Sequence, residues 1–266
     1  MSYPKVDFLY LDEPSMLKAG VCNMPECMNV VEECYHLLGN GDYVMGGKNH
    51  DSHGVKIVFP KTSPFPNMPL EGPDRRFMAM VAYAGGRFNV AGEKWYGSNT
   101  ANKAKGLPRS ILMVMLNDAD TGAPLALMSG NQISAMRTGA VPGVGARYLA
   151  RKDSKVCGLI GAGPISRSCF MSIVEACKEL EEVKIYDVFP EYAETLASWI
   201  KETYPQIKKA YYVPTCEECV RDSDVVNSAT SGKSLPYING EWIKKGAYVS
   251  LPAGIVMDRE YVLRDD

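Results

Sequence analysis

The 266-residue sequence lacks long apolar runs and blocks of like charge. A membrane-spanning helix needs roughly 20 consecutive apolar residues, and no segment approaches that length. The 29 basic and 31 acidic residues are spread along the chain, so its charge favours neither nucleic acid nor a membrane surface as a partner. No N-terminal segment combines a basic region, an apolar stretch and a small-residue cleavage site. We therefore expect a cytoplasmic protein that binds a small molecule.

The sequence is also poor in metal-binding patterns. Its eight cysteines are scattered and form no dense disulfide framework, so we interpret them as reduced thiols. Cys216 and Cys219 form a CxxC pair, but no second pair of ligands follows. His50 and His53 are an alternative ligand pair, although their spacing in a loop is more typical of solvated histidines. The sequence therefore predicts no metal site. Because all three histidines precede residue 54, a hydroxy-acid dehydrogenase with a histidine proton relay is disfavoured.

The first half of the chain has the pattern of an α+β domain. Apolar residues recur at helical spacing over residues 24–38, and glycines follow them. Three apolar or alternating runs, "VKIVFP", "RFMAMVAYAG" and "RSILMVMLND", predict strands joined by turns. In "LNDADTGAPLALMSG", Asp118 and Gly122 supply turn chemistry between two strands. We expect a domain over residues 1–132 that is built on a mainly antiparallel sheet.

The second half alternates between strands and helices. Residues 133–151 are rich in small residues and predict a closely packed helix, which Pro142 can kink. Strands are predicted at "KVCGLIGAG", "EVKIYDV", "AYYVP" and "DVVNSAT", and helices at residues 164–180, "EYAETLASWIKETY" and "TCEECVRDS". This alternation is typical of right-handed crossovers. It predicts an α/β domain over residues 133–266, a Rossmann-type doubly wound parallel sheet covered on both faces.

A glycine turn in "VCGLIGAGPISRSC" connects the first of these strands to the next helix. Gly161 and Gly163 allow the backbone to approach a pyrophosphate, and the helix N-terminus faces it with free amides. The candidate cofactor-binding residues here are Gly161, Ala162, Gly163, Pro164 and Ile165. The motif is incomplete, because Ser166 stands where a third glycine is common. The strand before it and the helix after it nevertheless favour a dinucleotide site.

Asp187 ends the next predicted strand, where a carboxylate accepts hydrogen bonds from the adenosine ribose. It would repel a 2′-phosphate, and "DVFPEY" offers no Arg or Lys beside it, so we expect NAD and not NADP. The alternative is a simple turn with an incidental aspartate. A later strand ends in "NSAT", where Ser228, Ala229 and Thr230 are further candidates for contact with NAD. These three are otherwise ordinary residues after a strand.

Several motifs together resemble the ornithine cyclodeaminase / mu-crystallin family. They are "GEKWYGSNTANKAKGLPRS", "LNDADTG", "RTGA", "LIGAGPIS", "IYDVFPEYAE", "SDVVNSATS" and "WIKKGAYVSLPAG", in the family's order from about residue 90 onward. The "KW…N…GLPRS…LND" wording is similar to the branch of opine-type NAD dehydrogenases that handle 2,3-diaminopropionate precursors. The resemblance implies an N-terminal substrate-binding and dimerisation domain, an NAD-binding Rossmann domain and a homodimer. Since family chains continue further, it also implies that the C-terminal domain is incomplete here.

The resemblance implies four further site residues. Lys94 in "GEKW" and Arg137 in "MRTGA" match a lysine and an arginine that hold the substrate carboxylate, a role that suits an ammonium and a guanidinium. Alternatively, Arg137 pairs locally and Lys94 is a solvated strand residue. Lys48 is the nearest candidate for a further substrate-binding cation. Cyclodeaminases carry a catalytic aspartate after the segment matching "GAYVS", whereas this chain reads "LPAGIVMDRE" and its nearest carboxylate is Asp258.

The resemblance therefore implies an NAD-dependent enzyme acting at the α C–N bond of an amino or imino acid, similar to ornithine cyclodeaminase. In a cyclodeaminase, a hydride leaves the α-carbon, the side-chain amine attacks the imine, ammonia departs and the hydride returns. An opine-type dehydrogenase or a ketimine reductase would instead consume NAD(H) stoichiometrically. The displaced aspartate favours this second route. A third alternative is a non-catalytic, crystallin-like binding protein.

Overall fold

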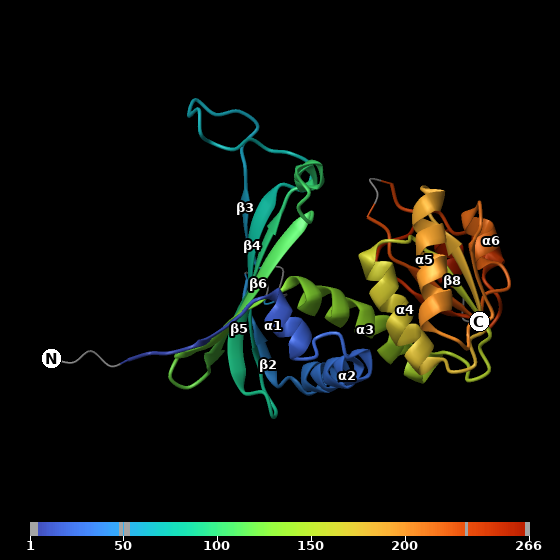
Figure 1. Ribbon diagram of the computed structural model, residues 1–266, viewed down its shortest axis with the longest axis horizontal. Coiled ribbons are helices and arrows are strands. Elements are labelled where there is room, and N and C mark those ends of the chain that lie inside the picture. The colour runs from blue at the N-terminus through green and yellow to red at the C-terminus, as the bar shows by residue number, and fades with distance from the viewer. Residues whose placement is uncertain (1–4, 48–49, 51–53, 232–233, 264–266) are drawn as a thin grey trace. The chain divides into compact units, whose positions relative to one another are not determined.

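The structure is a computed structural model that describes residues 5–47, 50, 54–231 and 234–263 (Figure 1). The chain divides into two compact units. The antiparallel-sheet unit comprises Met1–Cys22 and Glu33–Ser134, and the parallel-sheet unit comprises Asn23–Glu32 and Ala135–Asp266. In the described part of the chain, no helix has both the length and the apolar character needed to cross a membrane.

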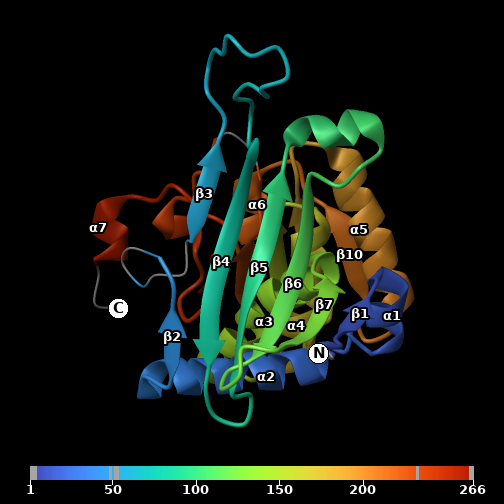
Figure 2. The same ribbon diagram turned by 90° about the vertical axis from the view of Figure 1, so that its left-hand side faces the viewer.

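The antiparallel-sheet unit is built on one sheet in the order β1-β7-β6-β5-β4-β2, with β3 paired to β4 (Figure 2). Its strands are β1 (Leu9–Leu11), β2 (Tyr43–Met45), β3 (Val55–Val58), β4 (Arg76–Ala84), β5 (Val90–Ser98), β6 (Ser110–Asp118) and β7 (Pro124–Ser129). All pairs are antiparallel except β1 with β7. The mainly antiparallel sheet, its three predicted strands and the β6–β7 hairpin are confirmed. The hairpin turn is closed by the Asp118 carboxylate, which accepts hydrogen bonds from the amide and hydroxyl of Thr121.

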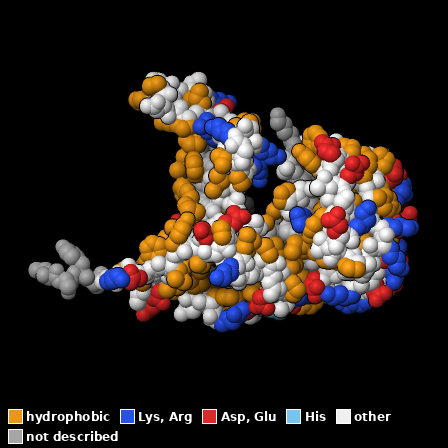
Figure 3. Space-filling model, viewed as in Figure 1, with side chains coloured by type: hydrophobic (Ala, Val, Ile, Leu, Met, Phe, Trp, Pro, Cys, Tyr) orange, Lys and Arg blue, Asp and Glu red, His pale blue; other side chains and the backbone are white. Residues whose placement is uncertain are grey.

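The two faces of this sheet differ in composition. Since directly opposite residues of paired strands point to the same face, the register assigns each side chain to one of them. One face, which we call the open apolar face, presents exposed Tyr10, Val55, Ile57, Phe77, Val81, Ile111 and Met113. Orange side chains line the sheet in Figure 3. The opposite face, which we call the Lys94 face, carries Arg76, Lys94 and Tyr96 together with buried Met78, Leu112 and Ala126.

Short helices complete this unit. α1 (Glu13–Lys18) begins after Asp12, whose carboxylate accepts a hydrogen bond from the Ser15 amide, as an N-cap does. A 3₁₀ segment, η1 (Thr100–Lys105), is capped by the Asn99 side chain and ends at Gly106 in the left-handed conformation. α2 (Met24–Asn40) agrees with the helix predicted over residues 24–38, and its first nine residues, up to Glu32, belong to the parallel-sheet unit.

The parallel-sheet unit contains a sheet in the order β10-β9-β8-β11-β12, and every pair in it is parallel. Its strands are β8 (Val156–Ile160), β9 (Glu182–Tyr186), β10 (Lys209–Tyr212), β11 (Val225–Ser228) and β12 (Tyr248–Ser250). The helical segments are α3 (Asn131–Leu149), α4 (Pro164–Ala176), α5 (Pro190–Thr203), α6 (Cys216–Val220), η2 (Gly240–Trp242) and α7 (Arg259–Val262). This confirms the predicted Rossmann-type α/β fold. The strand order reverses at β8, so the crevice for a ligand is expected at the carboxyl ends of β8 and β11.

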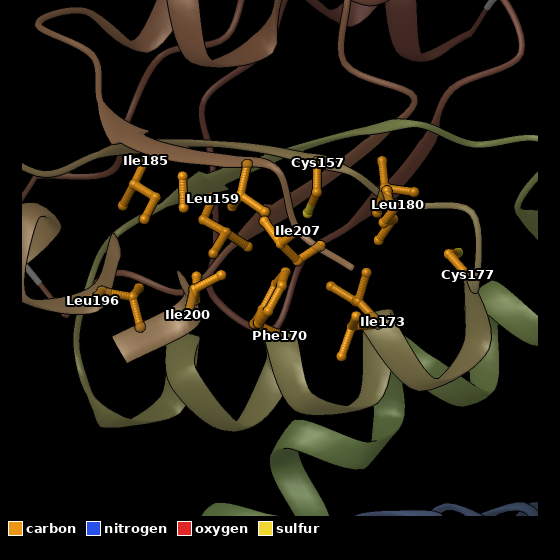
Figure 4. Close-up of a cluster of buried hydrophobic side chains, with 14 of the residues drawn as sticks. Cys157, Leu159, Phe170, Ile173, Cys177, Leu180, Ile185, Leu196, Ile200 and Ile207 are labelled. Carbon is orange, nitrogen blue, oxygen red and sulfur yellow. The ribbon is translucent and has the colours of Figure 1, made fainter. Parts of the chain in front are cut away.

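Apolar side chains cover both faces of this sheet. The larger cluster, between the sheet and α4 and α5, includes Leu159, Phe170, Ile173, Ile185 and Ile200, each with an exposed fraction of 0% (Figure 4). The second cluster combines Ile160, Val213, Cys219, Val220, Val226 and Ile238. A parallel sheet needs apolar cover on both sides, and the near-continuous apolar runs in the sequence reflect that.

Close packing joins α3 to α4. A Cβ on Gly139 would lie 2.5 Å from the Ser168 backbone carbon, and one on Gly143 would lie 2.4 Å from the Ser172 Cβ. The Ser172 hydroxyl donates a hydrogen bond to the Gly139 carbonyl. The prediction of a closely packed, small-residue helix is thus confirmed, with Pro142 inside α3.

Candidate functional site

The glycine turn lies at the carboxyl end of β8, where the strand order reverses. Gly161 is buried, and its φ of +94° is a backbone conformation that strongly favours glycine. A Cβ there would lie 2.7 Å from the Ala229 carbonyl oxygen. Gly163 is the N-cap of α4, and no side chain caps that helix. Pro164 occupies the first helical position, so the amides of Ile165 and Ser166 remain at the N-terminus for an anion.

Asp187 is tied directly to this turn. Its Oδ2 accepts a hydrogen bond from the Ala162 amide at 2.8 Å, and its Oδ1 accepts one from the Phe189 amide at 3.0 Å. The two bonds fix the carboxylate plane at the end of β9. Each oxygen keeps a second lone pair, which can accept a hydroxyl hydrogen.

The end of β11 adjoins the same turn. The Ala229 amide donates to the Ile160 carbonyl at 2.9 Å, and the Thr230 methyl lies 3.2 Å from where a Gly161 Cβ would be. The Ala253 amide donates to the Ser228 carbonyl. The ends of β8, β9 and β11 therefore bring together Gly161, Ala162, Gly163, Pro164, Ile165, Asp187, Ser228, Ala229 and Thr230.

These residues fit a dinucleotide. A Cβ on Gly163 would meet no atom within 4 Å, so open space faces the turn. The Ser166 and Ser228 hydroxyl groups are buried and, among the described residues, have no hydrogen-bond partner. Free helix amides, an open glycine and a fixed carboxylate are the groups that a pyrophosphate and a ribose require.

Lys94 lies in the antiparallel-sheet unit, in the middle of β5. It pairs with Met80 of β4 and Val114 of β6 and is half-buried. Its Nζ lies 5.7 Å from the Tyr96 ring centroid, within cation–π range. Lys94 is therefore a strand residue, and it lies beside Tyr96 on the Lys94 face of this sheet.

The remaining candidates have different settings. Arg137 is an exposed residue of α3 in the parallel-sheet unit. Asp258 is exposed before α7, and its carboxylate accepts a 2.8 Å hydrogen bond from the Tyr237 hydroxyl. This bond raises the pKa of Tyr237. Lys48 and His53 lie outside the described residues.

One polar cluster was not predicted from the sequence. Asp74, in the connection between β3 and β4, forms ion pairs with Arg76 at 2.9 Å and Arg109 at 2.8 Å. Arg76 lies on the Lys94 face, and its guanidinium carbon is 5.7 Å from the Tyr96 ring centroid. The sequence signal was "PDRR" immediately before a strand, but the partner Arg109 becomes evident only from the register of β4, β5 and β6.

A comparison with known families identifies the class of protein to which this fold belongs. The chain belongs to the ornithine cyclodeaminase/mu-crystallin family, whose sequence pattern matches residues 21–266.

A similar curated protein is N-((2S)-2-amino-2-carboxyethyl)-L-glutamate dehydrogenase from Staphylococcus aureus. It is 32% identical over 194 residues, which cover 72% of this chain and 56% of that relative. The chain thus spans little more than half the length of this relative.

Two solved structures are similar along most of the chain. One is Thermococcus litoralis Δ1-pyrroline-2-carboxylate reductase in complex with NADH and L-proline, with TM-score 0.76 and 30% identity, covering 91% of this chain and 68% of the other. The second is an archaeal alanine dehydrogenase dimer with bound NAD, with TM-score 0.73 and 29% identity, covering 91% and 66%. The prediction of NAD as the cofactor agrees with both.

Proposed function

We propose that the chain is an NAD-dependent oxidoreductase that acts at the C–N bond beside the carboxylate of an amino or imino acid. The observation that carries this proposal is the glycine turn, in which the Ala162 amide is bonded to Asp187 and the α4 N-terminus has no side-chain cap. The dehydrogenase and reductase relatives support it.

In this proposal the turn residues Gly161 to Ile165 hold the pyrophosphate, and Asp187 holds the adenosine ribose. Ser228, Ala229 and Thr230 line the cofactor site at the end of β11. Asp187 would repel a 2′-phosphate, and Val188 and Phe189 after it carry no positive charge, which favours NAD over NADP. When bound, NAD supplies hydride transfer.

Lys94 and Arg137 have the chemistry to bind the substrate carboxylate. A guanidinium offers a bidentate fork and an ammonium a point charge, so each of the two side chains is a candidate for holding that carboxylate. Lys48 is a third candidate cation. Asp258, which already accepts a hydrogen bond from Tyr237, is our candidate for holding a proton.

Two outcomes of the chemistry are open to this site. One is net dehydrogenation or imine reduction, and the other is redox-neutral cyclodeamination. We favour the first, because Ala253, Gly254 and Ile255 stand where the resemblance places a cyclodeaminase aspartate. Non-catalytic binding of a small molecule is the alternative from another class.

A spectrophotometric screen at 340 nm tests the proposal. The protein is mixed with NAD⁺ and alanine, ornithine, lysine or N-(1-carboxyalkyl) amino acids, and with NADH and pyrroline-2-carboxylate, while ammonia release is measured. We expect a stoichiometric absorbance change. Ammonia from ornithine without net NADH would establish a cyclodeaminase instead, and NADH binding without any turnover would support the binding protein.

Two variants separate the proposed roles. Arg137→Ala is expected to weaken the binding of substrate far more than the binding of NAD. Asp187→Ala is expected to weaken the binding of NAD far more than the binding of substrate. Equal losses of both ligands in either variant would contradict the roles.

We also propose that the protein is a homodimer that buries the open apolar face of the antiparallel sheet against a second copy. Its exposed Val81, Ile111 and Met113 form part of an apolar surface of the kind that marks an interface. The archaeal alanine dehydrogenase structure, described as a dimer, supports this partner.

A further inference from the structure

We propose that Arg76, on the Lys94 face, and Arg109, which shares the Asp74 carboxylate with it, form a second anion subsite, so that the preferred substrate carries an acidic group besides its α-carboxylate. This inference rests on the proposed function, in which Lys94 binds the α-carboxylate. It adds the substrate class and two residues that select it.

The first argument is charge. Two guanidinium groups share one carboxylate, because Asp74 pairs with Arg76 through Oδ1 and with Arg109 through Oδ2. The Asp74 side chain is only 17% exposed, whereas those of Arg76 and Arg109 are 39% and 42% exposed. One positive charge is left in surplus, on the more accessible groups.

The second argument is preorganisation. Asp74 has φ +52°, an uncommon conformation for a residue with a side chain, and its carbonyl accepts a 2.7 Å hydrogen bond from Ser98. Thr100 donates to the neighbouring Pro73 carbonyl at 2.9 Å. The connection is thereby fastened to the sheet, and its carboxylate holds both guanidinium groups in place. Groups fixed in this way lose little freedom when an anion binds.

The third argument is unused donor capacity. The Nε of Arg76 is buried and, within the described part of the chain, lacks a hydrogen-bond partner. The Asp74 ion pair occupies one Nη atom of a guanidinium that carries five N–H donors. Because the Nε has no accessible surface, an anion from solvent would use the remaining Nη–H donors.

The fourth argument is position relative to Lys94. The guanidinium of Arg76 and the ammonium of Lys94 each lie 5.7 Å from the Tyr96 ring centroid, so they are at most twice that distance apart. The Tyr96 hydroxyl is held by Ser110 at 2.7 Å. Two cationic groups therefore flank one fixed aromatic ring, an arrangement that suits a chain with an acid at each end.

Arg75 is a matched control beside Arg76. Its Nη1 donates to the Leu70 carbonyl at 3.1 Å, and its guanidinium lies 5.3 Å from the Phe59 ring centroid, so its donors serve the β3–β4 connection. Arg75→Gln removes the same charge one residue away from Arg76→Gln. Arg76→Lys keeps the charge but loses the fork.

The test compares L-glutamate with L-glutamine, and L-2-aminoadipate with its side-chain amide, because each pair differs only in the second acidic group. For the wild type and each variant, kcat/KM is measured with NAD⁺ at 340 nm, and Kd is measured by calorimetry with NADH present. We expect the wild type to prefer the acid by about 10- to 100-fold. Arg76→Gln should abolish that preference, Arg76→Lys should restore part of it, and Arg75→Gln should leave it unchanged.

Failure of this inference differs from failure of the proposed function. Turnover of amino acids with no preference for the acid would overturn the subsite and leave the oxidoreductase intact. If no substrate turns over, the ratio of the Kd values for the acid and its amide decides. The subsite is overturned if Arg76→Gln still prefers the acid, or if the wild type binds neither ligand. Thermal unfolding of each variant shows whether the fold is retained.

Discussion

The two sheets of this protein differ in how far their faces are buried by other parts of the chain. The parallel sheet has buried apolar clusters on both faces, and its polar groups are concentrated at strand ends. The antiparallel sheet has one apolar face exposed in the single chain and one face that carries cations. We infer from this comparison that burial on both faces of the parallel sheet stabilises the fold and fixes the strand ends. The exposed faces of the antiparallel sheet are instead available for binding. Substitutions in the two sheets should therefore fail in different ways.

The largest effect is expected at Asp224, which lies before β11. Its carboxylate is 3% exposed and accepts hydrogen bonds from Arg151 and Lys244, both at 2.6 Å, and from the Lys155 and Val156 amides. Asp224→Ala should lower the free energy of unfolding by about 3 kcal/mol, since two backbone amides and two partly exposed cations lose a shared acceptor. Chemical denaturation measures this. The exposed pair of Glu217 with Arg221 is the control, and Glu217→Ala should cost under about 1 kcal/mol.

Asp224 also predicts a dependence of stability on pH. Burial alone would raise its pKa, but hydrogen bonds from Lys244 and the two amides outweigh burial and lower it below 3.8. A depressed folded-state pKa contributes stability above the unfolded-state value, which is lost as the pH falls through the folded-state value. Unfolding measured between pH 5 and about pH 2 should show a smaller acid-induced loss in Asp224→Ala than in the wild type. Parallel curves would contradict this role for Asp224.

The open apolar face should respond through assembly and not through folding. Met113→Glu is expected to raise the dimer dissociation constant about 100-fold or more, because a carboxylate would be buried without a partner. Light scattering across a concentration series measures this, with thermal unfolding as a check on the fold. Lys56→Glu, on the other face of β3, is the control and should leave the dimer intact. A wild-type monomer at micromolar concentration would sink the dimer proposal.

Glycines in two helices should give stability changes of opposite sign. Gly143→Ala places a Cβ 2.4 Å from Ser172, so it should destabilise by about 1–3 kcal/mol. Gly39→Ala in α2 meets no atom within 4 Å and should stabilise by about 0.5–1 kcal/mol. Denaturant unfolding of both variants is the measurement. Equal shifts would mean that α3 and α4 adapt freely to extra volume.

The smallest expected effect is a difference in reactivity between exposed and buried cysteine thiols. Burial raises the pKa of Cys169 to about 12, and Cys219 is also fully buried, whereas Cys22 and Cys34 are exposed. Iodoacetamide at neutral pH should label the exposed pair first, and mass spectrometry should find the buried cysteines labelled only after unfolding. Rapid native labelling of Cys169 would show that the parallel-sheet unit opens.

The sequence predicted the parallel-sheet unit more completely than the antiparallel one. Continuous apolar runs and the glycine turn indicated β8, α4 and β9, although α4 ends at Ala176 and not at residue 180. β5 was not among the predicted strands, although a strand residue was one interpretation of Lys94, because Gly92, Lys94 and Gly97 interrupt its alternation. β1 was missed because it is only three residues long and lies at the edge of the sheet.

The candidate site divides along similar lines. Local spacing suggested that Gly161 and Asp187 act together, and the hydrogen bond from the Ala162 amide joins them. The cluster of Asp74, Arg76 and Arg109 could not be predicted, because its members meet only through the register of three strands. Patterns in the sequence identify groups joined by one turn, whereas cross-strand pairs require the fold.

The central claim, that the glycine turn and Asp187 hold NAD, is tested most directly by calorimetric titration with NADH. The wild type, Asp187→Ala and Glu191→Ala would be compared, since Glu191 is an exposed carboxylate in the same segment. We predict saturable binding by the wild type, a loss of about tenfold or more in Asp187→Ala, and no change in Glu191→Ala. Absence of NADH binding by the wild type, or equal affinity in Asp187→Ala, would contradict the account.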